Sequence, residues 1–224
     1  FQSLDDFIDR VPISVEQIAI LIKINAFRFT GVKKRELLWE AHLKISKTHI
    51  QEHIVTLFKN EKKNYKKPQL TSSDLENAFD EIELLGFPLC NPFDLLENQS
   101  SNPLRANQLL SYKNKTITIE GYLVTTKNTG TSNGKRMFFG TFLDRDGYFI
   151  DTVHFPPVAA KFPFRGKGVY TITGKVLEDF DCVNIEVLSM ERKAVIEDPR
   201  YAIKSLNPTF QKKKSFKDLK LHGL

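Results

Sequence analysis

The stretch that decides the fold runs from Thr116 to Lys193 and opens with the alternating sequence Thr-Ile-Thr-Ile-Glu-Gly-Tyr-Leu-Val (116–124). Apolar residues at every second position are typical of a strand that buries one face. Four further strand-like segments follow, separated by a loop, a turn and a longer connection. In chain order the segments are the loop 129–135, the strand 136–143, the turn Asp144-Arg-Asp-Gly147, the strand 148–155, the connection 156–165, and strands near 169–176 and 183–188. The turn has suitable residues, because Asp caps turns and Gly accepts a positive φ.

Three strands, a connection and two more strands are the order of the OB fold, a five-stranded Greek-key barrel. The residues before this stretch favour helices instead, since Val15, Ile18 and Leu21 have helical spacing behind a Ser14 N-cap. Asn25 is expected to end that helix in the left-handed conformation. A second helix is expected after Lys33, with Trp39 in the core and an apolar stripe of Leu37, Leu38, Ala41 and Ile45. A third is expected to begin at Ser73 and Glu76, which have capping-box spacing, and to end at Gly86. The predicted fold class is multidomain α+β: an all-α N-terminal part to about residue 97, followed by a five-stranded OB-fold β-barrel.

Composition narrows the class of protein. The chain has 224 residues, enough for two domains, and 41% hydrophobic residues, enough for real cores. It begins at Phe1 without Met or a signal peptide, so we expect a piece of a longer protein. The two cysteines, Cys90 and Cys182, fit a reducing compartment, and we expect a cytoplasmic protein without a disulfide framework. No apolar run has membrane-spanning length and no histidines have metal-ligand spacing, so neither a membrane partner nor a metal or other cofactor is expected.

The net charge of +6 belongs to the C-terminal tail. Residues 192–224 hold nine Lys and Arg against three Asp and Glu, and Lys212, Lys213 and Lys214 are the densest part. A second basic run, 59–67, precedes Pro68. Basic runs attract phosphate backbones, although either run could equally be a solvated linker. We predict that the tail is extended and binds nucleic acid without reading its sequence.

The two halves together resemble one family. The N-terminal motifs are Phe1-x-Ser-Leu-x-Asp-Phe7-x-x-Arg10, Leu21-Ile-Lys-x-x-Ala-Phe27, Gly31-x-x-x-Arg35-x-x-Leu-Trp39 and Glu83-x-Leu-Gly-Phe87-x-Leu. The barrel motifs are Thr131-x-x-Gly134-x-x-Met137-x-Phe139-x-Thr141-x-x-Asp144-x-x-Gly147, Phe155-Pro156 and Tyr170-x-x-x-Gly174-x-Val176. In this order they look like the C-terminal region of the bacterial C-family DNA polymerases, the DNA polymerase III alpha subunits.

The resemblance implies a domain plan. Residues 1–58 would be the end of a helix-hairpin-helix region, 59–115 a joining linker and helix, 116–193 an OB-fold single-strand-binding domain, and 194–224 the basic tail. The family's palm aspartates, which hold two Mg²⁺ ions, have no counterpart in this sequence. Asn25 also stands where the family has Gly, and the first hairpin of the usual tandem pair is missing. The parent protein would therefore be a DNA-directed DNA polymerase, and this chain is expected to be inactive alone, with no catalytic residues.

Candidate binding residues follow from the strand 136–143. Its alternation places Phe138, Gly140 and Phe142 on one face and Met137, Phe139, Thr141 and Leu143 on the other. The resemblance puts Phe139 where OB folds stack a base, and Lys127, Lys135 and Arg136 would hold the backbone. The alternatives are that Phe139 packs under a loop or against the helical half, and that the cations are solvated. Asp146 and Asp151 form at most a weak metal pair.

A second candidate site is Val55, Thr56, Leu57 and Phe58. Bacterial sliding-clamp ligands contain a Gln-Leu-Ser-Leu-Phe-like peptide, and the family places it between the hairpins and the barrel. Ile54 stands here in place of the Gln, and the alternative is ordinary helix core, because Ile50, Ile54 and Phe58 have helical spacing.

These signals favour a non-catalytic polymerase segment that binds single-stranded template DNA and helps to hold the enzyme on DNA. The sliding clamp and other replisome subunits are the expected protein partners. Two alternatives remain: a stand-alone OB-fold nucleic-acid-binding protein of repair or tRNA handling, and the same region of an error-prone translesion C-family polymerase.

Overall fold

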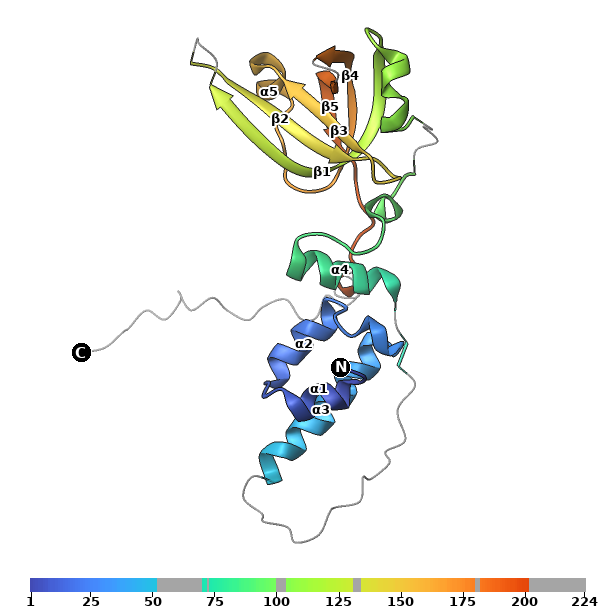
Figure 1. The fold of residues 1–224 in the computed structure, drawn as a ribbon, viewed down its shortest axis with the longest axis vertical. Coiled ribbons are helices and arrows are strands. Elements are labelled where there is room, and N and C mark those ends of the chain that lie inside the picture. The colour runs from blue at the N-terminus through green and yellow to red at the C-terminus, as the bar shows by residue number, and fades with distance from the viewer. Residues whose placement is uncertain (52–69, 72, 100–103, 131–133, 180–181, 202–224) are drawn as a thin grey trace, which may run out of the picture.

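The structure is a computed structural model that describes residues 1–51, 70–71, 73–99, 104–130, 134–179 and 182–201. A helical unit and a β-barrel lie at opposite ends of the molecule, and helix α4 (Asp74–Leu85) lies between them (Figure 1). The proposed clamp ligand Val55–Phe58 and the tail residues Lys212, Lys213 and Lys214 lie outside the described residues. No described helix combines the length and the apolar character needed to cross a membrane.

Five strands close into a barrel in the order β1-β2-β3-β5-β4. The strands are β1 (Thr116–Gly130), β2 (Arg136–Leu143), β3 (Phe149–His154), β4 (Val169–Asp179) and β5 (Cys182–Arg192). All neighbouring pairs are antiparallel except β3 and β5, which run parallel. Helix α5 (Pro156–Lys161) occupies the connection from β3 to β4. This is the topology of an OB fold, and with the helical half it confirms the predicted α+β class.

The barrel core follows from the alternation along each strand. Inward side chains of all five strands form one apolar cluster, to which Leu109 of the preceding 3₁₀ helix (Ala106–Tyr112) also belongs. Its buried members are Leu109, Ile117, Ile119, Leu123, Phe142, Ile150, Tyr170, Ile172, Val176, Ile185, Val187 and Met190. A β-bulge at Gly174 brings β4 so close to β5 that a Cβ would lie 2.5 Å from the Glu186 carbonyl oxygen. Only glycine fits at this position.

The predicted turn 144–147 is built around a buried carboxylate. Asp144 Oδ1 accepts hydrogen bonds from the backbone N–H groups of Asp146 and Tyr148, and its Oδ2 accepts one from Ala106. Gly147 has φ of 87°, as the turn requires. Asp144 therefore holds the β2–β3 turn against the segment that enters the barrel.

The helical unit contains α1 (Leu4–Arg10), α2 (Val15–Lys23), a 3₁₀ turn (Arg28–Thr30) and α3 (Lys34–Gln51). Its buried apolar residues are Leu4, Ile18, Ile22, Phe27, Leu37, Ala41 and Ile45. Ser14 caps α2 through a complete capping box, and Asn25 adopts φ of 64° after it, as predicted. Trp39 was expected in the core but is only half-buried, and it lies outside this cluster.

Charged contacts join α4 to the helical unit. Lys34 Nζ donates to Glu81 Oε1 at 2.7 Å and to the Lys23 carbonyl oxygen at 2.9 Å, and both members of the Lys34–Glu81 pair are buried. The predicted capping box at Ser73 is wrong, since the Ser73 side chain caps nothing. The Glu76 carboxylate that it needed accepts a hydrogen bond from Arg35 of α3 instead. Glu76 therefore binds a residue of another helix instead of the backbone at the start of its own helix.

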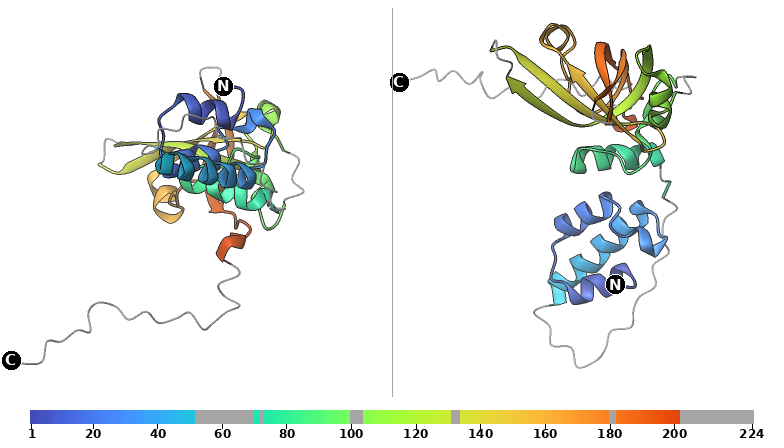
Figure 2. Two further views of the ribbon diagram at one scale, coloured as in Figure 1. Left: turned by 90° about the horizontal axis from the view of Figure 1, so that it is seen from below. Right: turned by 45° about the horizontal axis from the view of Figure 1, so that its top comes forward.

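Segments on both sides of the barrel also attach to α4 and to each other. The segment after α4 contains a 3₁₀ turn (Pro92–Leu95), and Phe93 and Leu96 pack on Val169 of β4. Leu96 then bridges to Val195 beyond β5, and Arg200 donates to Asp80 of α4 at 2.7 Å. Both views in Figure 2 show the described segment after β5 close to α4.

Candidate functional site

The outer surface of β1, β2 and β3 carries exposed aromatic rings. Phe139 of β2 and Phe149 of β3 are 39% and 66% exposed, and both point away from the barrel core. The next outward position after β3, Phe155, is 43% exposed. We call the surface formed by Phe139, Phe149 and Phe155 the aromatic face. Because a strand rises about 3.3 Å per residue, the rings of Phe149 and Phe155 are spread over roughly 20 Å.

The alternation of β2 predicted correctly that Phe139 faces outward, opposite to the buried Gly140 and Phe142. Within the part of the chain that the structure describes, Phe139 belongs to none of the three hydrophobic clusters. Phe149 and Phe155 were missed. The signal was present in β3, where buried Ile150, Thr152 and His154 alternate with outward residues.

A two-stranded arm brings cations to this face. Strand β1 pairs with β4 only as far as Tyr122, and its second half pairs with β2 alone. This arm projects from the barrel in Figure 1, and residues 125–130 are all exposed. A β-bulge between Leu123 and Thr125 shifts the register, so that Lys127 lies directly opposite Phe139 on the outward side. Without that bulge, Lys127 would point to the other side of the arm.

The four barrel residues proposed from sequence are not all on one surface. Lys127 lies on the aromatic face. Lys135, which directly precedes β2, is exposed and lines a groove beside α5. Arg136 is two residues before Phe138, so both side chains lie on the same side of β2. Together they line this groove, which is on the opposite side of the arm from the aromatic face. The structure therefore groups Phe139 with Lys127, and Arg136 with Phe138.

Carboxylates border the aromatic face. Asp151 lies between Phe149 and Val153 along β3 and accepts a hydrogen bond from Thr141 Oγ1 at 2.8 Å. Asp146, its suggested partner in a metal site, instead pairs with Arg105 at 2.8 Å. Within the described ranges, no group of three or more His, Cys, Asp or Glu side chains could hold a metal ion.

A neutral histidine lies beneath the face. His154 is fully buried on β3, its Nε2 lies 2.9 Å from Thr152 Oγ1, and its ring is 4.7 Å from that of Phe164. Among the residues that the structure describes, its Nδ1 finds no hydrogen-bond partner. Burial lowers the pKa of His154 from 6.5 to about 4, so the side chain is uncharged at neutral pH. It contributes no positive charge to the aromatic face.

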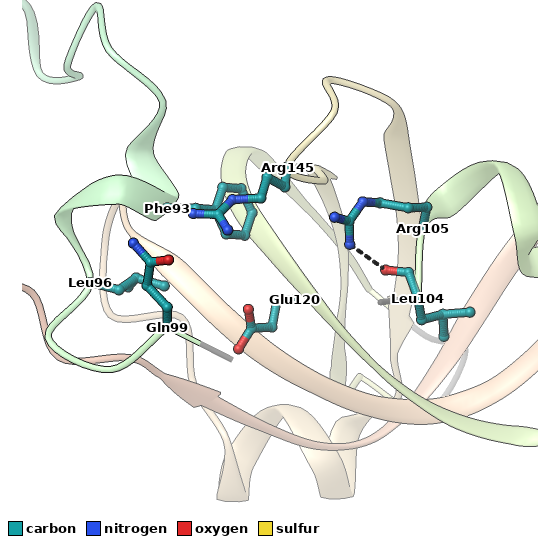
Figure 3. A pocket seen from close by; sticks show the side chains of 7 residues that line it. All are labelled: Phe93, Leu96, Gln99, Leu104, Arg105, Glu120 and Arg145. Atoms are coloured by element: carbon teal, nitrogen blue, oxygen red, sulfur yellow. Dashed lines mark hydrogen bonds between the residues drawn. The ribbon is translucent and has the colours of Figure 1, made fainter. Parts of the chain in front are cut away.

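A small hollow lies at the other end of the barrel, under the segment that leads in from α4 (Figure 3). Its volume of about 40 Å³ suits a few water molecules. The arginines at its edge are already paired, Arg105 with Asp146 and Arg145 with Asp94, and Arg145 lies over the Phe93 ring. We therefore interpret it as a packing feature of the entering segment.

Comparisons with known proteins add little to this geometry. No family model matches the chain, and no curated protein matches it. Solved structures that are similar include the second OB-fold domain of replication protein A from Methanococcus maripaludis (17% identity, TM-score 0.27, 38% of this chain and 91% of that one). Another is asparaginyl-tRNA synthetase from Entamoeba histolytica (14% identity, TM-score 0.28, 44% of this chain and 25% of that one). The assignment of the barrel topology rests on the strand order alone.

Proposed function

We propose that this chain binds single-stranded DNA across the aromatic face. Bases stack on Phe139, Phe149 and Phe155, while Lys127, which lies opposite Phe139, holds the backbone. The observation that carries the proposal is the set of three exposed rings along one side of a closed OB barrel, with a lysine opposite the central ring. Single-strand binding requires this combination, because every base has a π-face and every nucleotide carries a phosphate.

A purely structural explanation of the rings is less satisfactory. Single exposed apolar side chains are ordinary on a protein surface, but several aligned on one face mark an interaction site. Lys127 beside the rings attracts phosphate, whereas Asp151 and Glu186, the β5 partner of Val153, repel it. Because attraction by lysine and repulsion by carboxylates partly cancel, we expect a modest affinity for single-stranded DNA, without sequence preference.

Fluorescence anisotropy with a labelled oligothymidine tests the proposal. Replacing one ring, in Phe139→Ala or Phe149→Ala, should weaken binding by about 1–3 kcal/mol each, the usual contribution of one stacked base. Phe29, an exposed ring in the 3₁₀ turn Arg28–Thr30 of the helical unit, provides the matched control, and Phe29→Ala should leave the affinity unchanged. If the affinities of wild type and both Phe variants are equal, the aromatic face is not the binding site.

The finer part of the proposal is that the chain is a non-catalytic segment of a C-family DNA polymerase and helps to hold that enzyme on template DNA. The ordered sequence motifs support it, as does the turn between α2 and α3, where Asn25 takes the left-handed conformation expected of the family's Gly. The sequence encoded upstream of Phe1 tests it directly. Palm aspartates should be found there, and their absence would favour the stand-alone OB-fold protein.

A clamp-binding role for Val55, Thr56, Leu57 and Phe58 is a separate part of this proposal, supported by sequence alone. A peptide spanning Gln51 to Lys62 should bind the organism's sliding clamp, and the double replacement Leu57→Ala/Phe58→Ala should abolish binding. Equal binding by both peptides would remove these residues from the site.

A further inference from the structure

An open groove runs between the arm and helix α5, on the opposite side of β2 from the aromatic face. Its volume is about 550 Å³. Strand β2 supplies one wall and α5 the other, and the two elements lie side by side (Figure 1). The lining residues are Lys135, Arg136, Phe138, Pro156, Pro157, Ala159 and Ala160.

The two walls of the groove differ in charge. Two cations stand on the β2 wall, whereas the α5 wall is made of proline and alanine. Phe138 lies between them, partly buried, with its ring 6.1 Å from that of Phe164. Among the described lining residues there is no carboxylate. Such a groove suits a ligand that carries negative charge and flat apolar surface together.

The groove continues the aromatic face. Phe155, the last exposed ring on that face, directly precedes Pro156, the first residue of the α5 wall. On the β2 side, Met137 and Phe139 point to the aromatic face while Arg136 and Phe138 point to the groove. Phe155 and Pro156 therefore join the edge of the aromatic face to the α5 wall of the groove.

We propose that this groove is a second subsite for single-stranded nucleic acid, which takes the continuation of the strand held on the aromatic face. The inference rests on the proposed function. Arg136 contacts a backbone phosphate, and a base lies against Phe138 and the proline and alanine wall. The whole site then holds roughly four to eight nucleotides, within the range known for OB folds. A nucleic acid is favoured over an acidic peptide because the groove and the aromatic face are continuous.

Oligothymidines of two lengths test the subsite, with anisotropy as the readout. One of roughly four nucleotides fills the aromatic face, and one of roughly eight reaches the groove. Ala160→Glu adds bulk and negative charge to the α5 wall at an exposed position. It should weaken binding of the longer oligonucleotide about tenfold and leave the shorter one within about twofold. Asn107→Glu, which makes the same charge change at an exposed position in the 3₁₀ helix Ala106–Tyr112, is the control and should affect neither length.

A second variant avoids any change to the fold of α5. Arg136→Gln alters an exposed side chain of the arm. It should reduce the slope of log affinity against log salt by about 0.7 for the longer oligonucleotide only, since one phosphate contact is lost.

The outcomes separate the two proposals. If wild type binds neither length, the proposed function itself fails. If wild type binds both lengths and the Ala160→Glu and Arg136→Gln variants match it at both, only the groove subsite is overturned. If an acidic, leucine-containing peptide binds wild type but not Ala160→Glu, while both oligonucleotides bind the two proteins equally, the groove is a protein-binding site and the proposal is wrong.

Discussion

The barrel has two outer surfaces that use the same strand geometry for different purposes. On the side of β4, β5 and the first half of β1, polar groups satisfy one another, as in the 2.9 Å hydrogen bond between Thr118 and Thr173 and the Glu120–Lys193 ion pair. We call this side the threonine face. On the aromatic face, rings stand exposed beside lysine. The difference indicates that the paired polar groups of the first surface serve the barrel itself, whereas the second surface has chemistry directed at a ligand.

The largest expected effect compares paired replacements on the two faces. The double replacement Phe139→Ala/Phe149→Ala should weaken oligothymidine binding by about 2–6 kcal/mol, because two stacked bases are lost. Thr118→Ala/Thr173→Ala removes a pair that serves only the protein and should leave affinity unchanged. Anisotropy titrations of both double variants make the measurement. Similar losses on both faces would show that binding does not distinguish them.

The buried side chains beneath the two faces also differ, and this difference should make stability depend on pH. His154 lies under the aromatic face, while the interior under the threonine face is apolar, with Ile172, Val187 and Met190. The pKa of His154 is lowered in the folded state, so the unfolded chain takes up the proton first as pH falls. Stability contributed by neutral His154 is therefore present above the unfolded pKa of 6.5 and is lost as pH falls towards about 4, by about 3 kcal/mol in total.

Urea denaturation of wild type and His154→Leu checks this dependence. Between about pH 7.5 and pH 5, wild type should lose about 2 kcal/mol more unfolding free energy than the variant. The comparison uses the change with pH, so any fixed cost of the replacement cancels. If both proteins show the same change with pH, His154 is not buried in its neutral form.

A smaller effect separates the lysines of the two faces. Lys127 lies opposite Phe139, whereas Lys175 lies on β4 beside Glu186. Lys127→Gln should reduce the slope of log affinity against log salt by about 0.7, the contribution of one phosphate on a single strand. Lys175→Gln should give a line parallel to wild type. Equal slopes for the two variants would mean that both lysines act only through net charge.

The smallest expected effect concerns the carboxylate that opposes binding. Asp151→Asn removes a negative charge from the aromatic face, and we expect affinity to rise by less than about 1 kcal/mol, as for other exposed charges. Glu191→Gln makes the same charge change at an exposed position on β5 and should alter affinity less. A loss of affinity in Asp151→Asn would show that this carboxylate accepts a hydrogen bond from the ligand.

Sequence patterns were sufficient for most of the barrel, because a strand period of two and an Asp-x-x-Gly turn are local signals. They placed β2 at 136–143, as observed, and gave the outward direction of Phe139. The arm was not predicted, since residues 125–130 lack apolar alternation and are held by pairing with β2 alone. The position of Lys127 depends on a bulge, which the sequence does not specify.

Other differences between prediction and structure have tertiary causes. Glu76 has capping-box spacing, yet it binds Arg35, a residue far away in the chain. The groove depends on α5 lying beside β2, and the sequence indicated only a connection there. Phe149 and Phe155 could have been found, because the alternation that identified Phe139 applies equally to β3.

Nuclear magnetic resonance of the phenylalanine rings can show whether oligothymidine binds on the aromatic face. The full chain, labelled on phenylalanine, is titrated with an oligothymidine of roughly eight nucleotides. The ring signals of Phe139, Phe149 and Phe155 should shift, while that of Phe27, buried in the helical unit, should not. Shifts confined to rings of the helical unit, with the three rings of the aromatic face unchanged at saturation, would contradict binding on that face.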